Sequence, residues 1–329
     1  IVDELMVKDL SMTPCRFEIL FVVAILYFVE KKVEIAVVEV GLGGRGDPTN
    51  VILSEVSIIT NIDLEHQHIL GVTKEAIAHE KAGIIKANSI CVTTETDKKV
   101  LDVIASEAKN VQAKLIVLEP TDSELINQNL RGSVFNFLDM NNVELPLIGL
   151  HQISNAMLAI TTAQLLKKGG WGKINELTIR EGLRKTKWPL RMELVHRKPD
   201  FIIDGAHTPD AMRKVVDSLN MILPKDTKRI FILGFTEGKN YEEMLRILVA
   251  SYIRENDHVI VTEGKHSPVA AKKIVDILEN AGIGTEIITS VGESVKRVFK
   301  IAKKDESILC FGLYLCAEAR TEFIKLSND

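Results

Sequence analysis

Three polar loops carry the residues of this sequence that could do chemistry. The first is "EVGLGGRGDPTN" (39–50), which follows the apolar run 33–40. The second is "ITNIDLEHQH" (59–68), and the third is "AHEKAGIIK" (78–86). Carboxylate oxygens and imidazole nitrogens bind divalent cations, and the carboxyl ends of parallel strands lie at one edge of a sheet. If the first two loops follow adjacent parallel strands, they form a candidate metal site.

The first loop also contains the letters of a dinucleotide fingerprint. Gly41, Gly43 and Gly46 have the G-x-G-x-x-G spacing, but that motif needs a helix directly after the glycines to bind a pyrophosphate. The next apolar run, "VSIIT", begins at Val56 and leaves no room for a crossover helix. We therefore discount a nicotinamide or flavin enzyme. Two interpretations remain, a simple glycine turn or a loop whose strand-end carboxylate, Glu39, binds a hard cation.

His66 and Lys81 each have two interpretations. His66 is either a solvated loop residue or a ligand beside Glu39. Lys81 follows Glu80 and precedes "AGII". It is either one partner of a surface ion pair or a partly buried lysine, whose lowered pKa would allow its neutral amine to react.

Composition limits the class of protein. The chain has 329 residues, 46% apolar and 26% charged, which is typical of a globular protein with two domains of ordinary size. A net charge of -4 without a basic stripe argues against a nucleic-acid partner. The longest apolar run, 19–29, is shorter than a membrane span and predicts a buried helix. The cysteines lack a C-x-x-C pair, so we expect small buried side chains in a reducing compartment at Cys15, Cys91, Cys310 and Cys316.

Apolar runs alternate with helical patterns along the chain, which predicts an α/β fold with mostly parallel sheets. In the first half we expect strands at 33–40, 56–60, 89–93 and 114–118, helices at 73–85, 97–109, 155–168 and 174–185, and a small antiparallel sheet within 133–150. In the second half we expect strands at 201–204, 229–235, 258–263, 285–289 and 307–312, each followed by a helix. Between the halves lies "TKWPLRMEL", in which Trp188 is a predicted packing anchor. We place a domain boundary near Lys187, giving domains 1–187 and 188–329.

Eight segments in order resemble the folylpolyglutamate synthase/dihydrofolate synthase family of the Mur ligase superfamily. They are "MTPCRFEIL", "EVGLGGRGDPTN", "ITNIDLEHQHILG", "EKAGIIK", "GLHQISNA", "WPLRMEL", "IDGAHTPDA" and "FGLYLCAEAR". The resemblance implies a central ATPase domain of the P-loop type followed by a Rossmann-like domain. It also implies a cytoplasmic ligase that uses ATP and magnesium to join glutamate to a pterin-linked carboxylate through an acyl phosphate.

The resemblance also assigns residues to the metal and the nucleotide. Glu39 and His66 would coordinate magnesium, and Lys81 would be carbamylated so that its added carboxylate binds a second magnesium. Asn155 would contact adenine, and Arg191 would reach the phosphates from the second domain.

Asp204 and His207, in "DGAHTP", would contact the ribose and phosphates of the nucleotide. Arg191, Asp204 and His207 belong to the second predicted domain, so domain closure would complete the site.

The sequence departs from the family in one large respect. The family's phosphate loop, G-x-x-G-K-[ST], does not occur between Ile1 and Asp329. We expect a truncated chain that is inactive alone and of compromised stability; a split protein whose missing part is another chain, and a paralogue without ligase activity, are the alternatives.

Smaller departures leave the substrates open. Thr208 stands where the family usually has asparagine, and Phe311-Gly312 where it often has Gly-Ser, so the acceptor stays open between folate, dihydropteroate and another pterin acid. Other functions considered are a cell-wall Mur ligase, a non-catalytic protein that binds a nucleotide or a partner chain, and, last, a dehydrogenase.

Overall fold

The computed structural model describes residues 14–328 and divides into two compact units. Unit 1 comprises Ile1–Asp122 and Met157–Gly169, and unit 2 comprises Ser123–Ala156 and Gly170–Asp329. This division by contacts groups 123–156 and 170–187 with the C-terminal part of the chain. The predicted boundary near Lys187 separates two continuous segments of sequence, which these spatial units do not test, so it stays a prediction.

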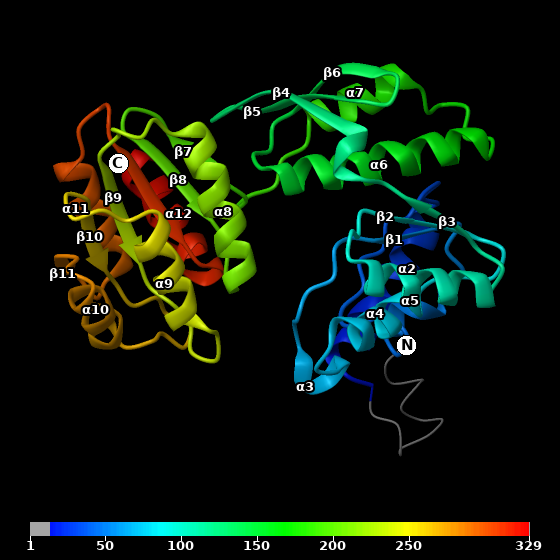
Figure 1. Cartoon of the computed structure of the whole chain (residues 1–329), viewed down its shortest axis with the longest axis horizontal. Helices are drawn as coiled ribbons and strands as arrows, with labels where there is room; N and C mark the ends of the chain where they lie inside the picture. The colour runs from blue at the N-terminus through cyan, green and yellow to red at the C-terminus, as the bar shows by residue number, and fades with distance from the viewer. Residues whose placement is uncertain (1–13, 329) are drawn as a thin grey trace. The chain divides into compact units, whose positions relative to one another are not determined.

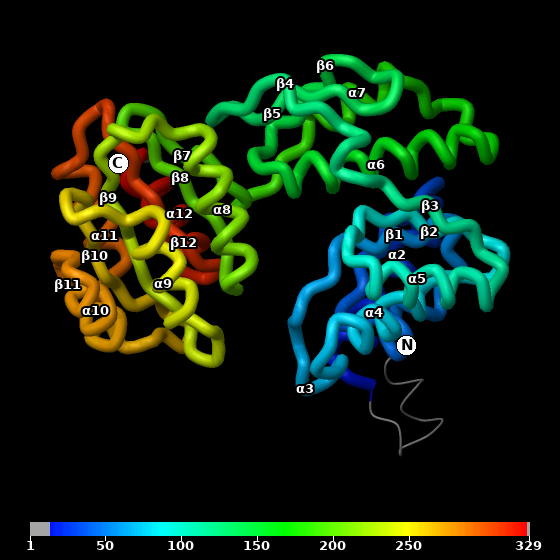
Figure 2. Tube along the Cα trace, in the orientation of Figure 1, coloured from blue at the N-terminus to red at the C-terminus, as the bar shows by residue number. Residues whose placement is uncertain are grey.

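Unit 1 is built on a three-stranded parallel sheet in the order β1-β2-β3. Its elements are α2 (Arg16–Lys31), η1 (Pro48–Val51), β1 (Val56–Ile59), α3 (Gln67–Leu70), α4 (Lys74–Ala82), β2 (Ile90–Thr93), α5 (Lys98–Asn110), β3 (Lys114–Val117), η2 (Pro120–Asp122) and the later part of α6 (Leu150–Lys168). Figure 2 shows β1, β2 and β3 side by side, with the chain returning through α4 and α5. One core joins the sheet to these two helices, because Ile59 and Cys91 pack with Ile77 and Ile104.

Two predictions for unit 1 are wrong in an instructive way. The apolar run 33–40 is extended but forms no strand among the described residues, and Val37 is 92% exposed. A strand needs a neighbour to satisfy its backbone hydrogen bonds, and none pairs with this run in the described part. The run 19–29 does form a helix, α2, but none of its residues is buried. The apolar pattern of the sequence located both segments, but it did not determine whether their side chains are buried.

Unit 2 carries a six-stranded sheet in the order β11-β10-β9-β12-β8-β7, parallel except for the pair β7–β8. Its strands and helices alternate as β7 (Glu193–His196), β8 (Asp200–Asp204), α8 (Pro209–Ile222), β9 (Arg229–Leu233), α9 (Tyr241–Ser251), β10 (His258–Val261), α10 (Ala271–Asn280), β11 (Thr285–Ile287), α11 (Val291–Ile301), β12 (Ser307–Phe311) and α12 (Leu313–Asn328). The five strands predicted for this half are confirmed. Their near-continuous apolar runs suit strands that are covered on both faces.

Helices cover both faces of the large sheet (Figure 1). On one face, α8, α9 and α10 pack against side chains such as Phe231 and Phe311. On the other, α11 and α12 pack against Phe201 and Ile308. Because β12 lies between β9 and β8, consecutive strands separate there, and such a switch point leaves a crevice at the carboxyl ends of the strands.

Unit 2 also contains the predicted small antiparallel sheet. It consists of β4 (Ser123–Asn129), β5 (Gly132–Phe137) and β6 (Met140–Leu145), paired in that order, and is followed by the early part of α6 and by α7 (Glu176–Arg184). The first strand, β4, was not predicted, because polar residues interrupt its apolar alternation.

Two smaller sequence predictions are wrong. Trp188 is 58% exposed and is not a packing anchor. Cys91, Cys310 and Cys316 are buried free thiols as expected, but Cys15 is exposed. Cys15 lies at the N-cap of α2, where its N–H donates to a carboxylate oxygen of Glu18 at 2.6 Å. The residue therefore belongs to the start of a helix and not to a hydrophobic core.

Candidate functional site

Hydrogen bonds to the Asp47 side chain hold the conformation of the glycine loop of unit 1 (residues 41–46). Its carboxylate accepts hydrogen bonds from the backbone N–H groups of Leu42 at 2.8 Å and Thr49 at 2.9 Å. Burial raises the pKa of Asp47, but the hydrogen bonds from Thr49 and Leu42 outweigh burial and hold the pKa below its ordinary value. This carboxylate therefore shapes the loop.

The same loop packs against the C-terminal turn of α4, the helix that carries Lys81. A Cβ at Gly44 would lie 2.7 Å from the carbonyl oxygen of Glu80 and 2.8 Å from that of Lys81. The N–H of Arg45 donates to the Glu80 carbonyl at 2.8 Å. Only glycine permits so close an approach, and it brings the first and third polar loops together. The residues after Gly46 form a four-residue 3-10 turn, which confirms that no helix follows the glycines.

The three predicted metal residues of unit 1 have free donor atoms. Glu39 is exposed, and within 14–328 its carboxylate has no hydrogen bond or ion pair. His66 begins α3 in the left-handed region, with φ 50°, and its ring centroid lies 6.3 Å from that of His68. Lys81 is half-buried and, within the same range, does not form the ion pair with Glu80 considered above. The residues from 14 to 328 contain no group of three or more His, Cys, Asp or Glu placed to hold a metal ion, so the magnesium site stays a prediction.

Unit 2 brings three predicted nucleotide residues together at the end of β8. Asp204 is buried, and its two carboxylate oxygens accept the N–H groups of Met192 and Ala206, each at 2.8 Å. Burial raises the pKa of Asp204 to about 6, against the lowering effect of these hydrogen bonds and of nearby Arg191 and His207. Asp204 thus ties the segment before β7 to the loop after β8.

The side chains of Arg191 and His207 both lie close to Gly205. A Cβ at Gly205 would lie 2.9 Å from Nη1 of Arg191, so the guanidinium covers this glycine. Nδ1 of His207 lies 3.0 Å from the Gly205 carbonyl oxygen, and that contact fixes the ring. A guanidinium and an imidazole beside a short glycine turn can bind an anion, in keeping with the predicted contacts.

Asn155 lies in the first half of α6 and is exposed, and its amide donates to Gln152 Oε1 at 3.2 Å. One turn earlier, His151 is half-buried. Burial, with the positive charges of Lys214 and Arg191, lowers the pKa of His151 to about 4. His151 was not predicted as a site residue, because a histidine inside a helical pattern does not indicate whether its ring will be exposed or packed against other residues.

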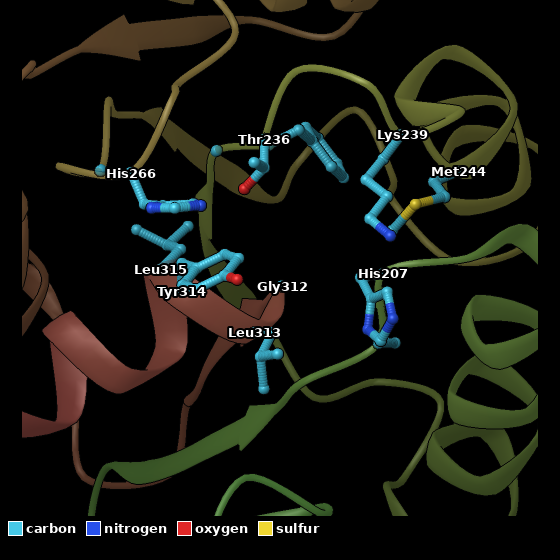
Figure 3. Close-up of a pocket in the computed structure, with 13 residues that line it drawn as sticks. His207, Thr236, Lys239, Met244, His266, Gly312, Leu313, Tyr314 and Leu315 are labelled. Atoms are coloured by element: carbon cyan, nitrogen blue, oxygen red, sulfur yellow. The ribbon is translucent and has the colours of Figure 1, made fainter. Parts of the chain in front are cut away.

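A cavity of about 170 Å³ opens at the switch point of the large sheet. Its wall comes from the loops after β8, β9, β10 and β12 (Figure 3). The polar side chains in the wall are those of His207, Thr236, Lys239, His266 and Tyr314, and among residues 14–328 no aspartate or glutamate lines it. A cavity with cationic and hydroxyl groups and without carboxylates suits an anionic ligand.

Sequence reasoning missed four of these five residues. Thr236 and Lys239 belong to "GFTEGKN", at the end of the predicted strand 229–235. His266 follows the predicted strand 258–263 in the same way, and Tyr314 follows the predicted strand 307–312. The rule that ligands bind at the carboxyl ends of strands could have selected these loops. Which loops meet depends on the insertion of β12 between β9 and β8, and the sequence pattern does not reveal that order.

Both halves of the chain match the sequence patterns of known domain families. Residues 17–163 match the Mur ligase middle domain, and residues 190–313 match the family described as Mur ligase, glutamate ligase domain. Among helices of the described residues, none has the length and apolarity to cross a membrane.

Three relatives show the extent of the similarity. The dihydrofolate synthase/folylpolyglutamate synthase of Bacillus subtilis is 36% identical over 241 residues, which cover 71% of this chain and 56% of that protein. The crystal structure of folylpolyglutamate synthase from Thermotoga maritima is 30% identical with a TM-score of 0.82, over 99% of this chain and 73% of that one.

A third structure, the FPGS–AMPPCP complex, is 26% identical with a TM-score of 0.79, over 98% of this chain and 75% of that one. The chain thus spans somewhat more than half the length of the Bacillus subtilis protein and about three quarters of the solved ones. Sequence, domain order and fold agree, and the chain belongs to the folylpolyglutamate synthase/dihydrofolate synthase family of the Mur ligase superfamily.

Proposed function

We propose that the protein is an ATP-dependent ligase that joins glutamate to a pterin-linked carboxylate by an amide bond. The observation that carries the proposal is the acid-free cavity of unit 2, which lies beside the cluster of Arg191, Asp204 and His207. Its volume, about 170 Å³, is below the roughly 300–1,000 Å³ of pockets for drug-sized ligands. A small anionic amino acid suits this volume better than a nucleotide or a pterin.

The reaction has two steps. An oxygen of the acceptor carboxylate attacks the γ-phosphorus of ATP, the bond to ADP breaks, and an acyl phosphate forms. The amine of glutamate then attacks the acyl carbon, and phosphate leaves with the oxygen that came from the acceptor. Catalysis rests on alignment of the reactants and on stabilisation of the phosphate charge.

The nucleotide contacts follow from the unit 2 cluster. The Arg191 guanidinium would bind phosphate oxygens while His207 donates beside it. Asp204 uses its oxygens for backbone hydrogen bonds, so we assign it the placement of Arg191 and His207 as well as the proposed ribose contact. Asn155 would contact adenine. The nucleotide analogue in the solved relative supports ATP as the phosphate donor.

Magnesium fits the donor chemistry of unit 1. The Glu39 carboxylate and the His66 ring have no competing partners among residues 14–328, and the half-buried Lys81 amine is available for carbamylation. When bound, magnesium neutralises phosphate charge. Glu39 and His66 would hold one ion, and carbamylated Lys81 would hold a second.

The proposed location is the cytoplasm. The four cysteines are free thiols, as expected in a reducing compartment.

The test is phosphate release from ATP by the purified protein. We expect release only when glutamate and a pterin acid are both present. Lys81→Ala should lower turnover, without rescue by bicarbonate, whereas the matched control Lys99→Ala, an exposed lysine of α5, should not change it. Release with a muramyl acceptor alone would favour a cell-wall ligase. Nucleotide binding without release under any condition would favour a non-catalytic relative.

A further inference from the structure

The last residues of the first and third polar loops bond to each other. Lys86, which ends "AHEKAGIIK", donates from Nζ to the backbone oxygen of Asn50 at 2.5 Å and to its side-chain Oδ1 at 2.7 Å. Asn50 ends "EVGLGGRGDPTN". We propose that Lys86 is a positioning residue that acts through Asn50 to hold the glycine loop against the end of α4, the helix that carries Lys81. This inference rests on the proposed function, because it assigns Lys86 to the placement of the proposed magnesium ligands.

Lys86 determines the orientation of the Asn50 amide. An ammonium group only donates hydrogen bonds, so the side-chain atom of Asn50 that faces Lys86 Nζ must be the oxygen. The amide nitrogen then donates to the Arg45 carbonyl at 3.0 Å and to the Gly83 carbonyl at 3.1 Å. In the opposite orientation the amide oxygen would face two carbonyl oxygens, and no hydrogen bond could form. Both bonds of the nitrogen therefore depend on Lys86.

The two carbonyls that Asn50 joins belong to different segments. Arg45 lies in the glycine loop, and Gly83 is the C-cap of α4, two residues after Lys81. The backbones approach closely here, because a Cβ at Gly83 would lie 2.5 Å from the Cβ of Arg45 and 2.6 Å from its Cα. The Asn50 amide thus connects the glycine loop to the helix end at the turn that follows Lys81.

The Lys86 ammonium has no carboxylate partner within the described part of the chain. The residue is half-buried, its hydrogen-bond acceptors are the two oxygens of Asn50, and burial lowers its pKa. Burying a charge without an opposite charge beside it costs free energy. A charged donor also makes stronger hydrogen bonds than a neutral one, and this strength suits a residue that fixes one amide orientation.

Other contacts should keep the glycine loop folded when Lys86 is replaced. Nη2 of Arg45 donates to Glu107 of α5 at 2.8 Å and to the carbonyl of His79 at 3.2 Å, and Asp47 holds the loop from within. Loss of Lys86 should therefore change the alignment of the loop with the helix end more than it changes folding. Misplacement of a catalytic group by about 1 Å can lower a rate about 100-fold.

Lys86→Met tests the connection directly, because it keeps an unbranched apolar side chain and removes the ammonium. Nuclear magnetic resonance of the nitrogen-15-labelled protein follows the side-chain NH2 of Asn50 and the backbone N–H of Arg45, which donates to the Glu80 carbonyl. Both should exchange with solvent about tenfold faster in the variant, as expected for loss of one hydrogen bond to a charged group. This measurement needs neither magnesium nor turnover.

Kinetics then separate positioning from a purely structural role. Lys86→Met should lower kcat for ligation about tenfold and leave the KM for glutamate unchanged. Lys86→Arg keeps a cationic donor and should regain most of the lost kcat and of the slow exchange. The matched control is Lys109→Met, at an exposed lysine of α5, which should change neither exchange nor kinetics. A purely structural role would lower stability towards urea and leave kcat per folded molecule unchanged.

These results distinguish the inference from the proposed function. Unchanged exchange at Asn50 and Arg45 in a folded Lys86→Met variant would overturn the connection. Faster exchange with unchanged kcat would overturn the positioning role of Lys86 and leave the ligase intact. Absence of ligation by the wild type would overturn the ligase, and the exchange measurement would still decide whether Lys86 holds the glycine loop against α4.

Discussion

Both units contain a parallel sheet packed against helices, but α2 of unit 1 buries none of its residues, whereas helices with buried faces cover both faces of the sheet of unit 2. Every residue of β9 and of β12 is buried, and α8 and α11 each bury several side chains against the sheet. In unit 1, α2 is apolar on all sides, yet none of its residues is buried. A helix with that composition is typical of a protein core. Composition alone therefore predicts the helix and does not predict its burial.

The two units also differ in how firmly they hold the residues of the proposed sites. In unit 2, the carboxylate of Asp204 accepts two buried backbone hydrogen bonds, and the loops after β8, β9, β10 and β12 line the cavity beside it. In unit 1, the glycine loop is fixed by Asp47, whereas Glu39 lies in an exposed extended segment. We infer that amino-acid recognition belongs to the more fully packed unit.

The largest expected effect compares two phenylalanines. Phe231 in β9 is 0% exposed, and Phe17 in α2 is 40% exposed. Phe231→Ala should lower the free energy of unfolding by about 3–5 kcal/mol, because it leaves a cavity in a closed core. Phe17→Ala should cost less than about 1 kcal/mol. Urea unfolding followed by far-ultraviolet circular dichroism measures both, and equal costs would show that α2 is packed as firmly as β9.

The next effect concerns a half-buried histidine, His151, and an exposed one, His66. His151 has a pKa of about 4 in the folded protein, against 6.5 for the unperturbed ring. Between these values the unfolded chain binds a proton that the folded protein does not, so acidification from pH 6.5 to pH 4 should lower the free energy of unfolding. The loss attributable to His151 is at most about 3.4 kcal/mol.

The measurement is urea unfolding at several pH values for wild type and His151→Gln, followed by the fluorescence of Trp171 and Trp188, which both belong to unit 2. The difference between the two proteins should change over this pH range. The control His66→Gln alters an exposed ring of unit 1 and should leave the curve of unit 2 unchanged. A pH-independent difference for His151→Gln would show that the pKa of His151 is not lowered in the folded protein.

The smallest effect tests the packed part of unit 1. Asp47→Ala leaves the N–H groups of Leu42 and Thr49 without their acceptor, and it should cost about 1–2 kcal/mol. Because the pKa of Asp47 is lowered in the folded protein, its contribution is present above the unfolded pKa and is lost as the pH falls through the folded value. Hydrogen exchange at the amides of Leu42 and Thr49 should accelerate. Unchanged exchange would mean that the other contacts of the loop maintain it.

The sequence predicted element types more reliably than their surroundings. Apolar runs such as 229–235 and 307–312 form strands because parallel strands in a covered sheet need apolar side chains on both faces. The run 33–40 is also largely apolar, and without a paired neighbour among the described residues it forms no strand. Trp188 was misjudged for a related reason, since a large aromatic residue near a boundary can lie on the surface.

The candidate site was predictable in part. Motif resemblance located Arg191, Asp204 and His207, and the structure places them in one cluster. It did not locate Lys239 or His266, because their meeting depends on strand order and on the bridges between two loops. These are long-range features of the fold, and local spacing does not encode them.

The most direct measurement uses an acceptor whose carboxylate carries oxygen-18. The protein is incubated with this pterin acid, ATP and glutamate, and the released phosphate and the amide product are analysed by mass spectrometry. Transfer through an acyl phosphate predicts one labelled oxygen in each phosphate and a glutamate-containing amide that has lost one label. Unlabelled phosphate, or phosphate release that does not depend on glutamate, would contradict the proposed ligase.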